Sequence, residues 1–176
     1  MNSVAPDSMS ADFTVTPTGG TFALGKHAVS FPANSICDPA TSGYGPEFWD
    51  APCQPLDHAI DFHAEIRAGA DGSTWIDFTP AVRFVPSADP NQTVWLLMKA
   101  NADITESNYQ AFGLKWMPTG APDLIVDESL TDSTLKTYVD LQRDVMFRRV
   151  KHFSGYINTG AVVEADVMPT LVDIVW

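Results

Sequence analysis

The sequence predicts an all-β protein, an antiparallel β-sandwich with a disulfide-stapled loop and an extended C-terminal tail. Thirteen prolines and eleven glycines are scattered along its 176 residues, a pattern that ends strands often and leaves little room for long helices. Several short runs alternate apolar and polar side chains, which is the period of a half-buried strand. With 45% hydrophobic residues, the chain can bury one sizeable core but is too short for two comfortable domains. We therefore expect an N-terminal tail at 1–12, a sandwich at 13–160 and a docking tail at 161–176.

The first strands are expected to be short and edge-like. They cover 13–17, 21–24 and 28–31, with the Gly19-Gly20 break between the first two and Pro32 after the third. Each carries apolar side chains at alternate positions, so each should bury one face.

The strands of the middle third have the clearest patterns. Residues 59–68 alternate cleanly and predict a half-buried strand. Residues 75–78 and 81–85 read as one strand interrupted at Pro80, where a bulge or an edge position is expected. Residues 93–98 are nearly all apolar, which predicts a central strand buried on both faces.

The last third of the chain is less regular. Residues 109–117 form an aromatic strand, and 124–126 a short one. Residues 131–144 fit a helix and a strand equally well, so both assignments stay open. Alternation returns at 145–157, but its parity shifts across Arg148-Arg149, which indicates a bulge or break before the final strand.

The two cysteines, Cys37 and Cys53, bracket a loop rich in Pro, Gly, Ser and aromatic residues. Such a loop supplies little regular structure, and a disulfide between the cysteines would hold it. Closing a loop of this length stabilises a fold by roughly 3 kcal/mol on the chain-entropy model. A disulfide implies an oxidising compartment, which here means a periplasm or the cell exterior.

Charge and hydropathy exclude several classes of partner. Twenty-two acidic and ten basic residues give a net charge of -12, so the protein repels nucleic acids and anionic membrane surfaces. No apolar run reaches the roughly 20 residues that cross a bilayer, so no transmembrane segment is expected. The residues after Met1 lack the regions of a signal peptide, so the chain is either not exported or a mature form.

No metal or cofactor site is predicted. The four histidines have no zinc-ligand spacing, and Asp57, Asp61 and Asp77 belong to no contiguous calcium loop. The sequence also contains no Gly-rich phosphate loop, nucleophile elbow or Cys-x-x-Cys pair. We therefore expect no cofactor and no enzyme beyond the self-cleavage considered below.

Three motifs resemble the ZU-five domain shared by zonula occludens proteins, netrin receptors and ankyrins. They are Gly-Gly-Thr-Phe at 19–22, Val-Ser-Phe-Pro-Ala-Asn at 29–34 and His-Phe-Ser-Gly-Tyr at 152–156. The resemblance spans about residues 13–160 and is closer to bacterial exported versions of the domain. It implies a β-sandwich, in agreement with the strand pattern.

In some animal relatives the His-Phe-Ser sequence is a self-cleavage site. The resemblance then implies that Ser154 attacks the carbonyl of Phe153 with assistance from His152. The alternative is structural: Phe153 and Tyr156 pack in the core, while His152 and Ser154 face solvent or make local hydrogen bonds.

Our leading hypothesis is a non-catalytic, extracytoplasmic structural subunit that binds other proteins of a larger assembly. The expected contact residues are the aromatic pair in the stapled loop and the apolar end of the tail: Phe48, Trp49, Leu171, Val172, Ile174, Val175 and Trp176. Packing of Phe48-Trp49 as a lid on the sandwich is the alternative. The chain is also similar, through no single motif, to periplasmic accessory subunits of bacterial photosynthetic reaction-centre and light-harvesting complexes, which implies a structural role without pigment ligands. A carbohydrate-binding or adhesion module that uses Trp49 and Trp116 is a further alternative.

Overall fold

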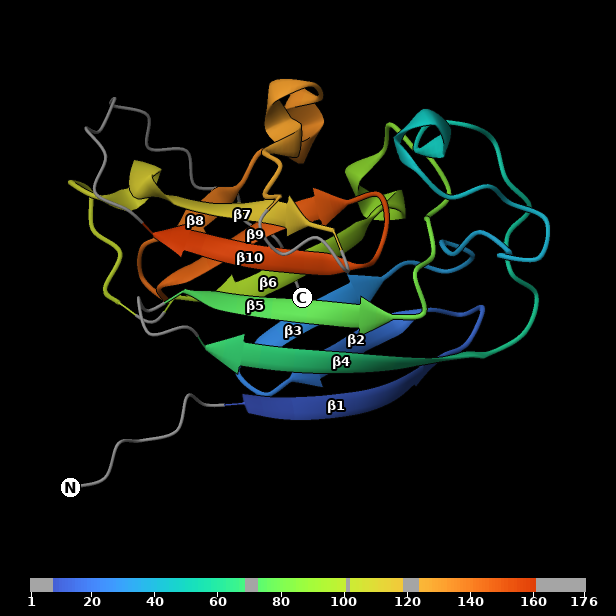
Figure 1. Ribbon diagram of the computed structural model, residues 1–176, viewed down its shortest axis with the longest axis horizontal. Helices are drawn as coiled ribbons and strands as arrows, with labels where there is room; N and C mark the ends of the chain where they lie inside the picture. The colour runs from blue at the N-terminus through green and yellow to red at the C-terminus, as the bar shows by residue number, and fades with distance from the viewer. Residues whose placement is uncertain (1–7, 69–72, 101, 119–123, 161–176) are drawn as a thin grey trace.

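The computed structural model describes residues 8–68, 73–100, 102–118 and 124–160. Their strands form two antiparallel sheets of five strands each, and Figure 1 shows the two sheets stacked one behind the other. No α-helix occurs in this part of the chain, where five short 3-10 turns serve as connections. The predicted β-sandwich is confirmed.

The first sheet has the order β1-β4-β5-β10-β7. Its strands are β1 (Ser8–Val15), β4 (Ile60–Ala68), β5 (Thr74–Thr79), β10 (Gly155–Gly160) and β7 (Phe112–Met117). The second sheet has the order β2-β3-β6-β9-β8. Its strands are β2 (Gly20–Leu24), β3 (His27–Phe31), β6 (Val94–Lys99), β9 (Val145–Val150) and β8 (Tyr138–Asp140).

The 3-10 turns lie in the segments that connect the strands. They are η1 (Pro46–Phe48), η2 (Pro90–Gln92), η3 (Tyr109–Ala111), η4 (Glu128–Leu130) and η5 (Ser133–Leu135). In η4 the carboxylate of Asp127 accepts a hydrogen bond from the backbone N–H of Ser129, which caps the turn. Asp132 caps η5 through Thr134 in the same way.

The core lies between the two sheets and follows the predicted alternation. In β4, Phe62, Ala64 and Ile66 are buried, whereas their neighbours face outward. β6 is the central strand of its sheet, as its apolar sequence predicts. Phe153 is fully buried and stacks on Phe78 with ring centroids 3.9 Å apart, so it ties the segment before β10 into this core.

Five sequence-based assignments need correction. β1 begins at Ser8, so part of the predicted N-terminal tail is a strand. Residues 81–85 and 124–126 contribute only isolated bridges. Residues 131–144 form η5 and the short strand β8 instead of one long element. The last strand begins at Gly155, after the His-Phe-Ser sequence.

Two alternatives were predicted near Arg148-Arg149, a bulge or a break before the final strand. The break is confirmed, since β9 ends at Val150 and β10 begins at Gly155, and the bulge is wrong. β9 pairs with β6 in an unbroken register, with Leu96 opposite Arg148 and Trp95 opposite Arg149. The parity does not shift, because Arg148 itself takes the inward position and is fully buried. A buried charge requires a partner of opposite charge, and the partner of Arg148 is Glu128.

Candidate docking face

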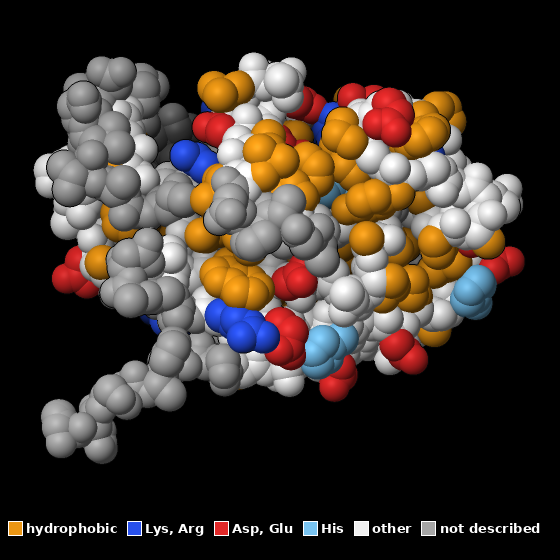
Figure 2. Space-filling view, in the orientation of Figure 1, with side chains coloured by type: hydrophobic (Ala, Val, Ile, Leu, Met, Phe, Trp, Pro, Cys, Tyr) orange, Lys and Arg blue, Asp and Glu red, His pale blue; other side chains and the backbone are white. Residues whose placement is uncertain are grey.

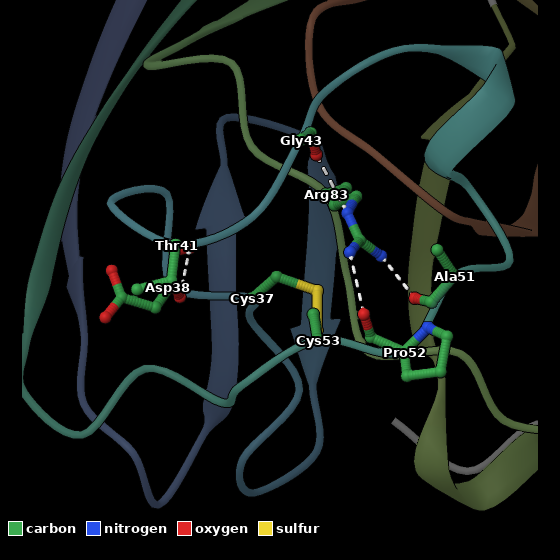
Figure 3. The surroundings of a disulfide bond; sticks show 8 residues. All are labelled: Cys37, Asp38, Thr41, Gly43, Ala51, Pro52, Cys53 and Arg83. Carbon is green, nitrogen blue, oxygen red and sulfur yellow. Dashed lines mark hydrogen bonds between the residues drawn. A yellow bond between two sulfur atoms is a disulfide. The ribbon is translucent and has the colours of Figure 1, made fainter.

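The stapled loop is held by two independent anchors. Cys37 and Cys53 form the predicted disulfide, with Cα atoms 5.6 Å apart. Arg83, which is buried, donates hydrogen bonds to three backbone carbonyls of the same loop, as Figure 3 shows: to Gly43 at 2.9 Å, Ala51 at 2.6 Å and Pro52 at 3.2 Å. The loop therefore has a defined shape although it contains little regular structure.

The aromatic residues of this loop divide into one anchor and two surface groups. Trp49 is only 7% exposed and stacks on His152 with ring centroids 3.9 Å apart. Phe48 and Tyr44 keep 37% and 39% of their surface exposed. Of the predicted contact pair, Trp49 is therefore packed on the sandwich, and Phe48 is the residue presented to solvent.

Beneath the loop lies a buried cluster of three ionisable side chains. One carboxylate oxygen of Glu128 accepts from Arg148 Nη2 at 2.8 Å, and the other lies 2.7 Å from His152 Nε2. Arg148 also donates to the carbonyls of Leu114 at 3.1 Å and Arg149 at 2.8 Å. All three ionisable side chains are buried, and the Glu128 carboxylate is the group that joins the other two.

Burial and neighbouring charges set the protonation of this cluster. Burial lowers the pKa of His152 and outweighs the hydrogen bond to Glu128 that would raise it. Burial alone would raise the pKa of Glu128, but its hydrogen bond to His152 and the charge of Arg148 hold that pKa below the ordinary value. We therefore assign an ionised Glu128 balanced by Arg148, and a neutral His152 that donates from Nε2.

The other residues of the His-Phe-Ser-Gly-Tyr motif also have structural roles. Ser154 Oγ accepts a hydrogen bond from Trp116 Nε1 at 2.8 Å. A Cβ atom at Gly155 would lie 2.3 Å from the carbonyl oxygen of Met117, so only glycine allows this close approach of β10 and β7. Tyr156 is buried and donates to the carbonyl oxygen of His152 at 2.6 Å.

The structural alternative for the motif is confirmed in part. Packing of Phe153 and Tyr156 in the core is confirmed. The prediction that His152 and Ser154 face solvent or make local hydrogen bonds is wrong, because both are buried and their side chains bond to Glu128 and Trp116, which are distant in sequence. Glu128 and Arg148 lie outside the motif in sequence, and local patterns could not reveal that a charged pair surrounds His152.

An exposed apolar surface lies above this cluster. We define the docking face by the exposed apolar residues of the stapled loop and of segment 124–130, which are Tyr44, Phe48, Leu124, Ile125 and Leu130. Figure 2 shows hydrophobic side chains gathered over the upper half of the molecule, the region where Figure 1 places η1 and η4. Leu130 is the most exposed of the set, at 83%.

Four contacts link the two parts of the docking face through Trp116 and Lys151. Trp49 packs edge-on against Trp116 with ring centroids 5.9 Å apart, and Trp116 forms a β-bridge with Val126. Lys151 forms ion pairs with Asp50 of the loop and Asp132 at the start of η5. The loop and segment 124–130 are thus held side by side on one rigid support.

The remaining predicted site residues do not come together in a chemical site. The ring of His152 bonds to Glu128 rather than to Ser154, and its backbone carbonyl accepts a hydrogen bond from Tyr156. No group of three His, Cys, Asp or Glu side chains in the described part of the chain is placed to hold a metal ion. Leu171, Val172, Ile174, Val175 and Trp176 lie outside the described residues. No helix of the described segments is long and apolar enough to span a membrane.

Comparison of the chain with protein-family models, curated proteins and solved structures found no match. The resemblances to the ZU-five domain and to photosynthetic accessory subunits therefore stay predictions from short motifs and general pattern.

Proposed function

We propose that this protein is a non-catalytic, extracytoplasmic structural subunit that binds a larger, membrane-associated protein assembly through the docking face. The observation that carries the proposal is the position of Leu130, which is 83% exposed at the end of η4. Two residues earlier, Glu128 is fixed in the core by Arg148 and His152. A large apolar side chain is thus presented to water on a rigid turn.

Rigidity matters because ordering loops during association costs free energy. The disulfide and Arg83 hold the stapled loop in place before any partner arrives. Exposed aromatic side chains such as Tyr44 and Phe48 on a preordered surface are typical of protein interfaces. The disulfide itself supports an oxidising compartment, and the resemblance to photosynthetic accessory subunits makes such a complex the first one to examine.

The test is co-purification of a tagged protein from its native membranes after mild solubilisation. We expect the wild-type protein to recover a defined set of partner subunits and Leu130→Asp to lose them. Gln92→Asp adds the same charge at an exposed site in η2 and should keep the partners. Both variants should unfold at the wild-type temperature, because changes at exposed sites rarely exceed about 0.5 kcal/mol. Recovery of the same partners with Leu130→Asp would refute the proposal.

A second candidate function is self-cleavage between Phe153 and Ser154. It is favoured by one contact: the hydroxyl of Tyr44 donates to the carbonyl oxygen of Phe153 at 2.5 Å. A donor at this oxygen would stabilise negative charge that develops there during attack. Ser154 Oγ would add to the Phe153 carbonyl carbon, and the C–N bond would break as the serine proton passes to the nitrogen. Water would then hydrolyse the resulting ester.

Intact-mass measurement distinguishes the two candidates. Self-cleavage produces two fragments whose summed mass exceeds the chain by one water, and Ser154→Ala abolishes them. A single full-length species in the wild-type protein, unchanged in Ser154→Ala, removes this candidate. That result leaves the docking proposal intact, since docking needs no cut.

A further inference from the structure

β1 is the edge strand of its sheet, and one of its sides has no partner strand among the described residues. Within the described chain it pairs only with β4, from Ser8 opposite Arg67 to Val15 opposite Ile60. The register is continuous and contains no bulge. Proteins usually protect such edges with lysine, proline or a bulge, yet β1 contains neither lysine nor proline, and Asp12 is its only charged residue. Figure 1 shows this edge at the bottom of the molecule, away from η1 and η4.

The inward side chains of β1 become progressively less covered toward its beginning. Val15 is buried, Phe13 and Ala11 are half-buried, and Met9 is 44% exposed. Phe13 stacks on Phe22 of β2 with ring centroids 5.0 Å apart, so this end of the sandwich is closed by partly exposed rings. An added strand beside β1 would cover them.

The sequence of β1 is complementary to itself. We propose that β1 pairs antiparallel with β1 of a second copy, with the two Ala11 residues opposite each other on a two-fold axis. Residues 8–14 of both copies then form pairs. Phe13 lies opposite Met9 of the other copy, and a thioether beside an aromatic ring is a favourable contact. On the outer face Asp12 lies opposite Ser10, whose hydroxyl can donate to a carboxylate.

Neighbouring registers are less favourable. An axis at Asp12 would place the two Asp12 carboxylates opposite each other, and like charges in that position destabilise a sheet. An axis at Phe13 would pair only residues 11–15 and would leave Met9 uncovered. An axis midway between two residues is excluded, because it would place inward side chains opposite outward ones.

The net charge of the chain predicts how this dimer responds to salt. Two copies that each carry -12 repel one another. Added salt screens that repulsion, with a Debye length of about 8 Å at physiological ionic strength. Salt should therefore strengthen the β1–β1 dimer, whereas it would weaken binding of a basic partner strand at the same edge.

Sedimentation velocity of the purified full chain over a roughly hundredfold concentration range tests the proposal. We expect a monomer–dimer equilibrium that shifts toward dimer as salt is raised. Met9 lies on the inward face of β1 at its uncovered end, so Met9→Lys places a charge within the proposed interface. This substitution should weaken dimerisation at least about tenfold. Leu130→Lys makes a similar change on the docking face and should have no effect. A monomer at all concentrations, or a dimer unaffected by Met9→Lys, would overturn the proposal.

Cysteine cross-linking tests the register. Directly opposed Cα atoms in an antiparallel pair lie about 4.5–5.5 Å apart, within the range that a disulfide spans. Ala11→Cys should therefore give a covalent dimer on mild oxidation. Thr21→Cys is exposed on the edge strand β2 and should stay monomeric. Equal cross-linking of the two variants would refute the β1 register.

Discussion

Replacing the buried Arg148 by Met should lower the free energy of unfolding more than replacing an exposed arginine would. The substitution keeps a long side chain on the inward face of β9 but removes the charge that balances Glu128. Glu128 lies 2.8 Å from Arg148 Nη2 and is buried. Removal of one partner from a buried ion pair costs about 3–5 kcal/mol, because the other charge is left without compensation.

That cost converts into a measurable shift in melting temperature. For a chain of this size each 1 kcal/mol lowers the melting temperature by about 2–4 °C. Arg148→Met should therefore melt about 6–20 °C below the wild type. Arg143→Met is the matched control, since Arg143 pairs with Asp140 while its own side chain is 76% exposed. A surface pair of this kind contributes only about 0–1 kcal/mol.

A double-mutant cycle with Glu128→Gln isolates the pair itself. The introduced amide would keep an oxygen that accepts from His152 but would carry no charge, so the double variant contains no unbalanced ion. We expect a coupling energy of about 2–3 kcal/mol between the two sites. The assay is urea unfolding followed by tryptophan fluorescence with the disulfide intact. Two outcomes would refute the idea that Arg148 balances the charge of Glu128. One is that the effects of the two single substitutions on the free energy of unfolding are additive. The other is that Arg148→Met lowers this free energy no more than Arg143→Met does.

Three further predictions concern stability. The pKa of His27 is lowered to about 4 by burial and by the charge of Lys26, and the pKa of His152 is lowered too. The unfolded chain therefore binds protons below about pH 6.5 that the folded protein excludes. The free energy of unfolding is therefore highest above that pH and falls as the pH is lowered. Protonation of His27 in the unfolded chain should lower it by about 2 kcal/mol at pH 5. Equal free energies of unfolding at pH 7.5 and pH 5 would contradict this prediction. Replacing both cysteines by serine should cost about 3 kcal/mol, and a urea midpoint within error of the wild type would show that Arg83 alone orders the loop. Gly155→Ala should lower the melting temperature because its Cβ would meet a backbone oxygen of β7, and an unchanged value would mean that the strands can separate at little cost.

Local sequence patterns were sufficient for the architecture. Proline and glycine spacing, together with period-two runs such as residues 60–66, predicts many short half-buried strands. The fully apolar run at 94–98 predicts the central strand. These inferences succeeded because a strand buries its apolar face whatever its partner is. The disulfide was predicted for a similar reason, since Cys37 and Cys53 lie close in sequence around a loop with little structure.

The candidate site depended on contacts that local patterns do not encode. Arg148 disturbs the apolar alternation of β9, and from the sequence alone this indicates a bulge or a break without revealing the buried ion pair. Only the fold brings Glu128, the buried residue of η4, beside Arg148 and His152. A buried charge is stable only beside its partner. The sequence by itself therefore determined which strand faces are buried. The tertiary structure decided which polar side chains could also be buried in the core and which apolar side chains stay exposed.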